Sequence, residues 1–209
     1  MNMIANRHEA AEKLAEKLQK YKGENGIILA IPRGGVPMGV LIANELDFPL
    51  EVTLSKKIGH PNNPEFAIGS VSLESEHLNE NIDFPEEYVK AEMERIRQEL
   101  KRRYELFMGD HKPTNLNNKV VIIVDDGIAT GHTLMMTVEM VKKQHPAKIV
   151  IAVPVGPPSM MRYFEERVDE VVYLMAPQGF YAVGQFYEEF REVSDEEVAE
   201  SLKELGIKN

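Results

Sequence analysis

Apolar residues recur every three or four positions in several stretches of the chain, and this spacing predicts helices that bury one face. The clearest pattern covers residues 86–108, where charged residues fill the opposite face. Residues 7–21 show a similar pattern that ends before Gly23, a residue type common just after helices. The remaining predicted helices are 36–46, 132–144, 158–167 and a C-terminal helix with Ser194 as its N-cap and Glu197 three residues later.

Short apolar runs between these helices predict strands. The predicted strands are 26–31, 50–54, 119–124, 148–155 and 170–175. Strands that alternate with helices form mostly parallel sheets with both faces covered. We therefore expect an α/β fold, a mostly parallel central sheet flanked by helices, in one domain over residues 1–209. In such sheets, ligands bind outside the carboxyl ends of the strands.

Residues 55–69 interrupt this alternation. The run SKKIGHPNNPEFAIG contains two prolines, two glycines and two asparagines, which is typical of a loop. Loops of this length in compact domains are often functional. We therefore predict a mobile functional loop here.

Charge and composition narrow the classes of protein. Acidic residues outnumber basic ones 34 to 24, so a nucleic-acid partner bound through a broad basic surface is not expected. A local pocket can still bind a small anion. The chain has no cysteine, which excludes disulfides and thiolate metal sites. No apolar run reaches the roughly 20 residues of a membrane span, and the first residues lack a signal-peptide core. We expect a cytoplasmic protein with no membrane partner.

The stretch VVIIVDDGIATGHTL, residues 120–134, joins a buried strand to a helix through a sharp turn. Gly127 and Gly131 allow the backbone to approach a ligand closely. Thr130 and Thr133 add hydroxyl groups. Exposed amides at the start of a helix, together with the helix dipole, favour a phosphate.

Asp125 and Asp126 cannot favourably contact that phosphate. They would accept hydrogen bonds from neutral hydroxyl groups or help to hold a metal ion. A ligand with a phosphate at one end and a diol nearby has the shape of ribose 5-phosphate. The Walker pattern GxxxxGK[ST] and the dinucleotide pattern GxGxxG are both absent.

This stretch resembles the phosphoribosyl-diphosphate (PRPP) motif of the type I phosphoribosyltransferases. The family pattern is a hydrophobic strand, two acids, two variable residues, a small or acidic residue, and Thr-Gly-x-Thr. The resemblance implies that the acids bind the ribose hydroxyls and the turn binds the 5-phosphate. Some members have an acid, assigned base chemistry on a purine, where this chain has Ala129. The residues implied to bind PRPP here are Asp125, Asp126, Gly127, Ile128, Ala129, Thr130, Gly131, His132 and Thr133.

A second turn, residues 31–37, also joins a strand to a helix. Its Arg33 supplies a planar cation suited to phosphate, although the stretch alone also fits a surface turn with a solvated arginine. The segment resembles the pyrophosphate-binding loop of the same family, which often contains a non-proline cis peptide. The resemblance implies that Arg33, Gly34 and Gly35 contact the pyrophosphate of PRPP.

Lys56 and Lys57 begin the predicted loop, at the position of the family's mobile catalytic loop. A lysine pair alone is usually solvated. The resemblance implies that the loop closes over PRPP, excludes water and brings positive charge to the leaving pyrophosphate. Either lysine could make the contact. Together with Arg33, Asp125 and Asp126, Lys57 completes the predicted catalytic set.

Residues 177–190 concentrate five aromatic residues after the last predicted strand. They could form a small core for the C-terminal helix, and residues 177–209 are expected to form a hood with the N-terminus. The run also resembles the purine-binding end of hypoxanthine–guanine-type transferases, which implies that Tyr181, or its neighbour Phe180, stacks on a base. The same resemblance implies that Glu188 binds Mg²⁺, directly or through water, beside the two acids of the turn. The family's purine-selecting lysine has no counterpart, and Arg162 is the nearest cation.

The resemblance as a whole implies Mg²⁺-dependent transfer of ribose 5-phosphate from PRPP to a nitrogenous base, with release of pyrophosphate. A purine-like acceptor, as in purine salvage, is favoured. Two alternatives stay open: a non-catalytic protein that senses PRPP or nucleotides, and a different nucleotide-binding α/β enzyme. The expected partners are small molecules, and a homodimer is left open.

Overall fold

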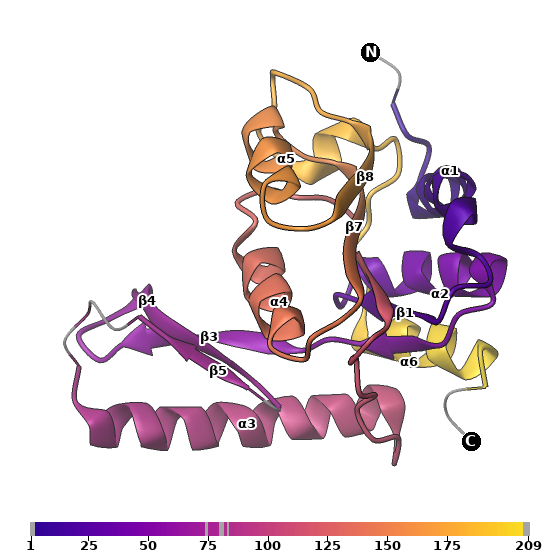
Figure 1. Cartoon of the computed structure of the whole chain (residues 1–209). Helices are drawn as coiled ribbons and strands as arrows, with labels where there is room; N and C mark the ends of the chain where they lie inside the picture. The colour runs from indigo at the N-terminus through magenta and orange to yellow at the C-terminus, as the bar shows by residue number, and fades with distance from the viewer. Residues whose placement is uncertain (1–2, 74, 80–81, 83, 207–209) are drawn as a thin grey trace.

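The computed structural model of the chain describes residues 3–73, 75–79, 82 and 84–206. Its centre is a five-stranded parallel sheet in the order β2-β1-β6-β7-β8 (Figure 1). The strands are β1 (Gly26–Ala30), β2 (Leu50–Val52), β6 (Val120–Val124), β7 (Lys148–Val155) and β8 (Glu170–Met175). The predicted α/β fold with a mostly parallel central sheet is confirmed.

Helices cover both faces of this sheet, because its strands are apolar on both sides. Val121 and Ile123 of β6 pack into one core, and Ile122 and Val124 pack into the other, as strand pleating requires. The side of Ile122 is covered by α1 (Arg7–Leu18), which continues as the short η1 (Gln19–Tyr21), and by α2 (Gly35–Leu46). The opposite side is covered by α4 (His132–Lys142) and α5 (Pro158–Glu165).

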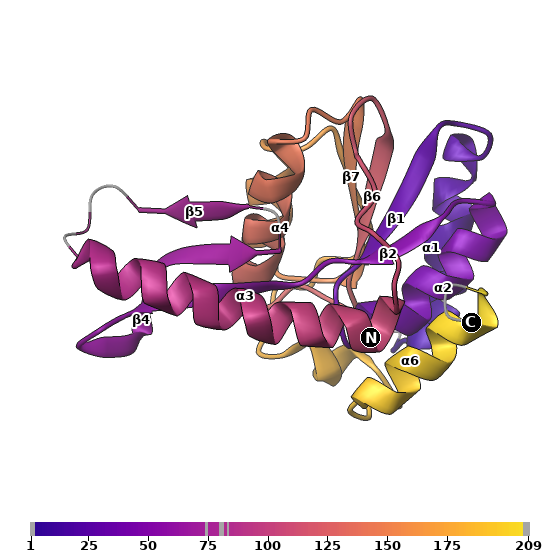
Figure 2. The same ribbon diagram turned by 90° about the horizontal axis from the view of Figure 1, so that it is seen from below.

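An arm extends from this body (Figures 1 and 2). We use the name arm for the described residues of 55–108. It consists of the antiparallel strands β3 (Ser55–His60), β4 (Asn63–Ser72) and β5 (Glu76–Leu78), packed on the long helix α3 (Glu86–Met108). The predicted helix 86–108 is confirmed. The prediction of an irregular loop over 55–69 is wrong, since this segment forms most of a β-hairpin.

The physical reason lies in the apolar residues among the prolines and asparagines. Ile58 and Ile68 are fully buried and belong to the same core as Ile96 of α3. The two glycines allow close approach of neighbouring strands. A Cβ on Gly59 would lie 2.5 Å from the carbonyl oxygen of Pro64, and one on Gly69 would lie 2.5 Å from that of His77. The glycines therefore serve packing within the small sheet, and the mobility of the segment stays a prediction.

Residues near the N-terminus meet the segment after β8 on one side of the body. Ile4 donates its amide to the carbonyl of Phe186 at 2.9 Å, and Glu188 donates its amide to the carbonyl of Ile4 at 2.8 Å. We use the name hood for residues 3–6 and 177–194, which include the short η2 (Val183–Phe186). The chain then enters α6 (Asp195–Glu204), which packs against α2 and α3. The predicted capping of α6 by Ser194 and Glu197 is confirmed.

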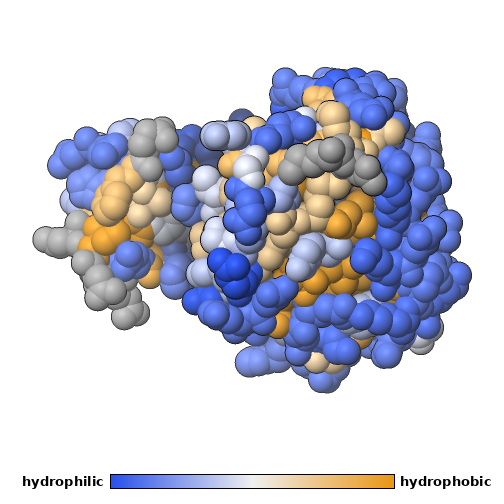
Figure 3. Space-filling view, turned by 90° about the horizontal axis from the view of Figure 1, so that it is seen from above, coloured by the Kyte–Doolittle hydropathy of each residue, from blue (hydrophilic) through white to orange (hydrophobic). Residues whose placement is uncertain are grey.

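The surface of the molecule is unevenly apolar. Seen from above, apolar colour gathers on the arm and over the middle of the body, whereas the rim of the body away from the arm is hydrophilic (Figure 3). The most exposed large apolar side chains among the described residues are Met3, Phe66, Leu106 and Tyr181. Within the part of the chain that the structure describes, no helix combines the length and apolarity needed to cross a membrane.

Candidate functional site

The register of the central strands brings two predicted binding loops together. Ala30 of β1 pairs with Val124 of β6, so both strands end at the same level. Ile31 donates its amide to the carbonyl of Val124 at 2.9 Å. A Cβ on Gly35 would lie only 2.5 Å from that same carbonyl oxygen. The loop after β1 and the loop after β6 therefore touch through their backbones, and this contact requires glycine.

The loop after β6 forms a hollow at the carboxyl edge of the sheet. Asp125 and the continuous run 127–134 line it. Gly131, with a φ of 74°, is the N-cap of α4, and its missing side chain leaves room for the methyl group of Met160. His132 and Thr133 are exposed in the first turn of α4, where helix amides have no partner within the helix. This geometry suits a phosphate.

The two acids of the loop have different surroundings. Asp125 lines the hollow, and its Oδ1 accepts a hydrogen bond from the amide of Asp126 at 2.8 Å. The Oδ2 of Asp126 instead accepts two hydrogen bonds from Arg7, from Nε at 2.9 Å and from Nη2 at 2.7 Å. A Cβ on Gly34 would collide with this oxygen at 1.8 Å. Asp126 therefore ties α1 to both binding loops.

Burial and mutual repulsion dominate the charge balance of these acids. Burial raises the pKa of Asp125 well above its ordinary value, and the neighbouring charge of Asp126 raises it further. Burial also raises the pKa of Asp126, although the Arg7 guanidinium opposes the change. Arg7 is thus the cation that holds negative charge at the end of β6.

The hood fixes Arg7 and Asp126 in place. The ring of Phe190 lies 4.0 Å from the Arg7 guanidinium, and the carbonyl of Arg191 accepts a hydrogen bond from Arg7 Nη1 at 2.8 Å. The hydroxyl of Tyr187 donates to the carbonyl of Asp126 at 2.9 Å. Sequence patterns give no sign of the role of Arg7, whereas Tyr187 lies in the predicted aromatic run.

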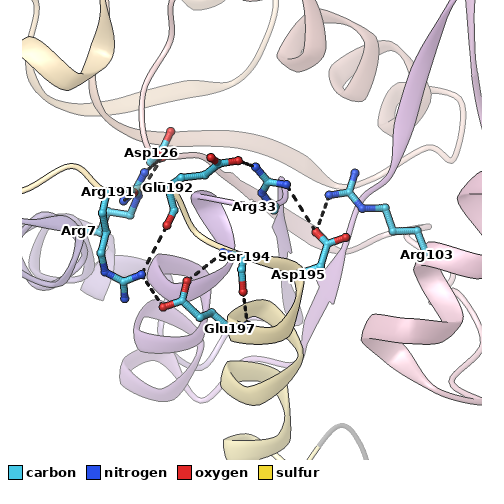
Figure 4. A network of polar contacts seen from close by, with 9 residues as sticks. All are labelled: Arg7, Arg33, Arg103, Asp126, Arg191, Glu192, Ser194, Asp195 and Glu197. Carbon is cyan, nitrogen blue, oxygen red and sulfur yellow. Dashed lines mark hydrogen bonds and ion pairs between the residues drawn. The ribbon is translucent and has the colours of Figure 1, made fainter.

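The loop after β1 presents Arg33 to a group of acids (Figure 4). The peptide bond between Pro32 and Arg33 is cis. The guanidinium of Arg33 forms an ion pair with Glu192 and lies 4.0 Å from Asp195 Oδ1. Arg103 of α3 contacts that same oxygen at 2.9 Å. The sequence predicts Arg33 but not Arg103 or the two acids, because these come from distant segments.

The hairpin places the two predicted lysines, Lys56 and Lys57, on opposite faces of β3. Strand pleating places Lys56 and Ile58 on the face that packs against α3, where Lys56 forms an ion pair with Glu99 at 2.7 Å. Lys57 is exposed on the other face of β3. Of the two, Lys57 is therefore better placed to meet a ligand outside the arm.

The predicted base-binding rings also differ from each other. Phe180 stacks on the buried Phe186, with ring centroids 5.3 Å apart. Tyr181 is 91% exposed. The side chain of Gln185 accepts hydrogen bonds from the amides of Tyr181 and Ala182 at 2.9 and 3.2 Å, so it orders the turn that carries Tyr181. Phe180 belongs to the hood core, and Tyr181 offers a free ring face.

The structure does not gather the three predicted metal ligands into one cluster. Glu188 is exposed on the hood, and no three or more His, Asp or Glu side chains of the described residues are grouped to hold a metal. Asp125 and Asp126 alone provide hard oxygen ligands at the end of β6. Mg²⁺ usually binds through one or two carboxylates together with substrate oxygens and water, so the pair fits an ion that arrives with a phosphorylated substrate.

Comparison with known proteins places this site in a family. Residues 2–174 match the phosphoribosyl transferase domain. A Mycobacterium tuberculosis (strain H37Rv) relative named "Putative phosphoribosyl transferase Rv0571c" is 35% identical over 207 residues, covering 97% of this chain and 47% of the relative. A relative from strain CDC 1551 has the same identity and coverage. The chain spans about half the length of the curated relatives it matches.

Solved structures agree with this match. The protein TT1426 from Thermus thermophilus is 35% identical and has a TM-score of 0.84, covering 98% of this chain and 99% of that one. Purine phosphoribosyltransferase from Pyrococcus horikoshii Ot3 shares the fold at 23% identity, with a TM-score of 0.51 over 90% and 92% of the two chains. The family match includes both binding loops, and this chain therefore belongs to the phosphoribosyl transferase domain family.

Proposed function

We propose that this protein transfers the ribose 5-phosphate group of PRPP to a nitrogenous base and releases pyrophosphate. One observation carries the proposal: the run 127–134 and Asp125 line a single hollow at the carboxyl end of the central strand β6. Amides at a helix start favour a phosphate, and a carboxylate favours hydroxyl groups. A ribose 5-phosphate presents both a phosphate and hydroxyl groups.

In this reaction, the bond between the anomeric carbon and the pyrophosphate oxygen breaks, and its electron pair leaves with pyrophosphate. The lone pair of the acceptor nitrogen forms the new bond, and the nitrogen loses its proton. The protein's task is to hold the sugar and to stabilise the departing charge. Residues 125–133 serve the first purpose, and Arg33, Gly34, Gly35 and a lysine of the arm serve the second.

Mg²⁺ is the cofactor in this proposal, since it would neutralise part of the diphosphate charge when bound with PRPP. Asp125 and Asp126 would hold it, or hold the ribose hydroxyls beside it. Glu188 is a third candidate ligand, although its place on the hood requires the hood to move or a water molecule to bridge the gap.

The acceptor in this proposal is a flat, purine-like base. Tyr181 supports this choice, because an exposed ring on an ordered turn can stack on any planar base. Arg162 is exposed on α5, and it is the only cation of residues 157–162, the segment nearest to the position of the family's purine-selecting lysine. A role in purine salvage in the cytoplasm is consistent with this acceptor.

A second candidate function is that of a protein that senses PRPP without transferring its ribose. It is favoured because Asp126 contacts Arg7 and Arg33 contacts Glu192. A ligand that replaces these contacts would change how the hood is held, which is the behaviour of a PRPP-sensing protein.

A calorimetric titration of PRPP with and without Mg²⁺, followed by assays of pyrophosphate release with purines, pyrimidines and small amines, tests both functions. We expect Mg²⁺-dependent binding and release with a purine-like base. Binding without release for every acceptor would identify a sensor. Absence of binding would refute both functions.

A further inference from the structure

Two arginines from separate parts of the molecule point at one carboxylate (Figure 4). Arg33 comes from the loop after β1, and Arg103 comes from α3 of the arm. Asp195 Oδ1 lies 2.9 Å from Arg103 Nη2 and 4.0 Å from Arg33 Nη1. Glu192 pairs with Nη2 of Arg33. The two guanidinium groups therefore converge on a position that acids of the C-terminal segment fill.

Glu192 is held weakly, whereas Asp195 belongs to α6 and is one-third exposed. The side chain of Glu192 is 81% exposed, and it belongs to a stretch between η2 and α6 that has no regular secondary structure. Exposed ion pairs of this kind contribute little to stability and exchange readily. A diphosphate carries more charge than a carboxylate and can accept several hydrogen bonds from each planar guanidinium. It would compete effectively for the same two arginines.

We infer that Arg33 and Arg103 form one binding site for the diphosphate group of PRPP, and that Glu192 and Asp195 fill this site until the ligand displaces them. The identity of the ligand as PRPP rests on the function proposed above. Arg103 is thereby an additional ligand-binding residue, delivered by the arm. Because the acids and the diphosphate use the same cations, their binding is mutually exclusive, and the acids lower the apparent affinity for the ligand.

The first test removes a competitor. Inorganic pyrophosphate with Mg²⁺ is titrated into the wild-type protein and into Glu192→Gln. Loss of an exposed ion pair should tighten binding about twofold to fivefold, and the gain should shrink at high salt. Glu189→Gln is the matched control, since Glu189 is an exposed acid of the same segment and the substitution changes net charge equally. We expect no change in its affinity.

The second test removes the added cation. Arg103→Gln should weaken pyrophosphate and PRPP binding roughly tenfold to a hundredfold, because a charge-assisted hydrogen bond is lost. Arg102→Gln is the control: Arg102 is the exposed neighbour on the same helix, and its loss should leave both affinities unchanged. In an Arg33→Gln background, Glu192→Gln should no longer tighten binding, since the shared partner is gone.

Each outcome decides between the claims. Wild-type binding of PRPP together with unchanged affinity in Glu192→Gln overturns the inference and leaves the proposed function standing. Variant effects on pyrophosphate without any PRPP binding support the two-arginine site and overturn the proposed function. Binding of neither ligand overturns both. Circular dichroism and thermal unfolding confirm that each variant is folded, and Glu192→Gln, at an exposed position, decides the inference if Arg103→Gln unfolds.

Discussion

The proposed phosphate end and the proposed leaving-group end of the site are built in different ways. The first is one continuous loop, residues 125–133, whose backbone is set by β6, by the start of α4 and by glycines at close contacts. The second consists of side chains on long stems from the loop after β1, α3, α6 and the hood. Backbone geometry exists before a ligand arrives, whereas ion pairs must exchange partners when it does. The proposed phosphate end would therefore position the ligand, whereas ion pairs at the proposed leaving-group end would rearrange when the ligand binds.

The largest effect is expected where the two ends touch. A Cβ at residue 35 would lie 2.5 Å from the Val124 carbonyl oxygen and 3.0 Å from the Asp125 Cα, and backbone atoms cannot yield. Gly35→Ala should cost about 1–3 kcal/mol of stability through overpacking. It should also lower PRPP affinity roughly a hundredfold, because both loops shift. Thermal unfolding and calorimetry measure the two quantities.

Gly179→Ala provides the control for that experiment. A Cβ there would meet nothing within 4 Å, so neither stability nor PRPP affinity should change. If Gly35→Ala behaves like Gly179→Ala, the two loops are not coupled through their backbones.

Asp125→Asn should separate binding from stability. The charge-assisted hydrogen bonds to the ligand are worth about 1.5–3 kcal/mol each, so PRPP affinity should fall roughly tenfold to a hundredfold. The folded state should nevertheless become more stable at neutral pH. Burial and Asp126 raise the pKa of Asp125 above its unfolded value, so the folded carboxyl holds its proton more tightly. The free energy of unfolding of the wild type therefore falls as the pH rises from the unfolded pKa of this carboxyl to its folded pKa. The variant does not show this loss, because an amide does not ionise.

Unfolding midpoints measured at several pH values, with calorimetry at neutral pH, test this expectation. Asp126→Asn is the comparison, because it breaks the pair with Arg7 and should lower PRPP affinity. Its gain in stability at neutral pH should be smaller than that of Asp125→Asn, since Arg7 opposes the rise in the pKa of Asp126. Equal stability changes in the two variants would show that the acids have equivalent surroundings.

Tyr181→Ala should raise the Michaelis constant for the acceptor roughly tenfold, since a base–aromatic stack contributes about 1–3 kcal/mol. PRPP affinity should hold its wild-type value. Phe180→Ala should instead lower the stability of the protein, because its ring stacks on the buried Phe186. An unchanged Michaelis constant for the acceptor in Tyr181→Ala would show that the base binds elsewhere.

Lys57→Ala should produce the smallest effect, a severalfold loss of turnover with PRPP affinity almost unchanged, because the charge that it meets develops as pyrophosphate leaves. Lys56→Ala removes an ion pair with Glu99 instead and should leave turnover near the wild-type rate. Proteolysis within residues 55–69, slowed by PRPP with a base analogue, would support closure of the arm. Equal cleavage rates with and without ligand would argue against it.

The features that follow from neighbouring residues could be predicted. The five strands of the central sheet, α3 and the capping of α6 by Ser194 and Glu197 all have local patterns. The strand–turn–helix geometry of residues 120–134 is equally local, and its binding of a phosphate stays a prediction. The hairpin over 55–72 could not be predicted in this way, because its prolines and asparagines obscure Ile58 and Ile68, whose burial depends on the later α3.

The parts of the site built from distant residues have no local pattern. Arg7 lies 119 positions from Asp126 and 184 from Arg191. Nothing in the sequence around Arg7 distinguishes it from any other cation in the first turn of a helix. Arg103 is similarly one of many charges on α3. Such contacts depend on the final topology, and only the folded structure can place them.

The junction of residues 3–7 with residues 186–191 also has a consequence for biosynthesis. A ribosome makes residues 3–7 long before residues 186–191, so the emerging chain can form α1 and the early strands while Arg7 still has no partner from the hood. The backbone contacts of Ile4 and the hydrogen bond of Arg7 to Arg191 need residues 186–191, which are made after all strands of the central sheet. A chain that stops before residue 186 would have the loop proposed to bind the phosphate but not the contacts that hold Arg7, so we expect it to bind PRPP poorly.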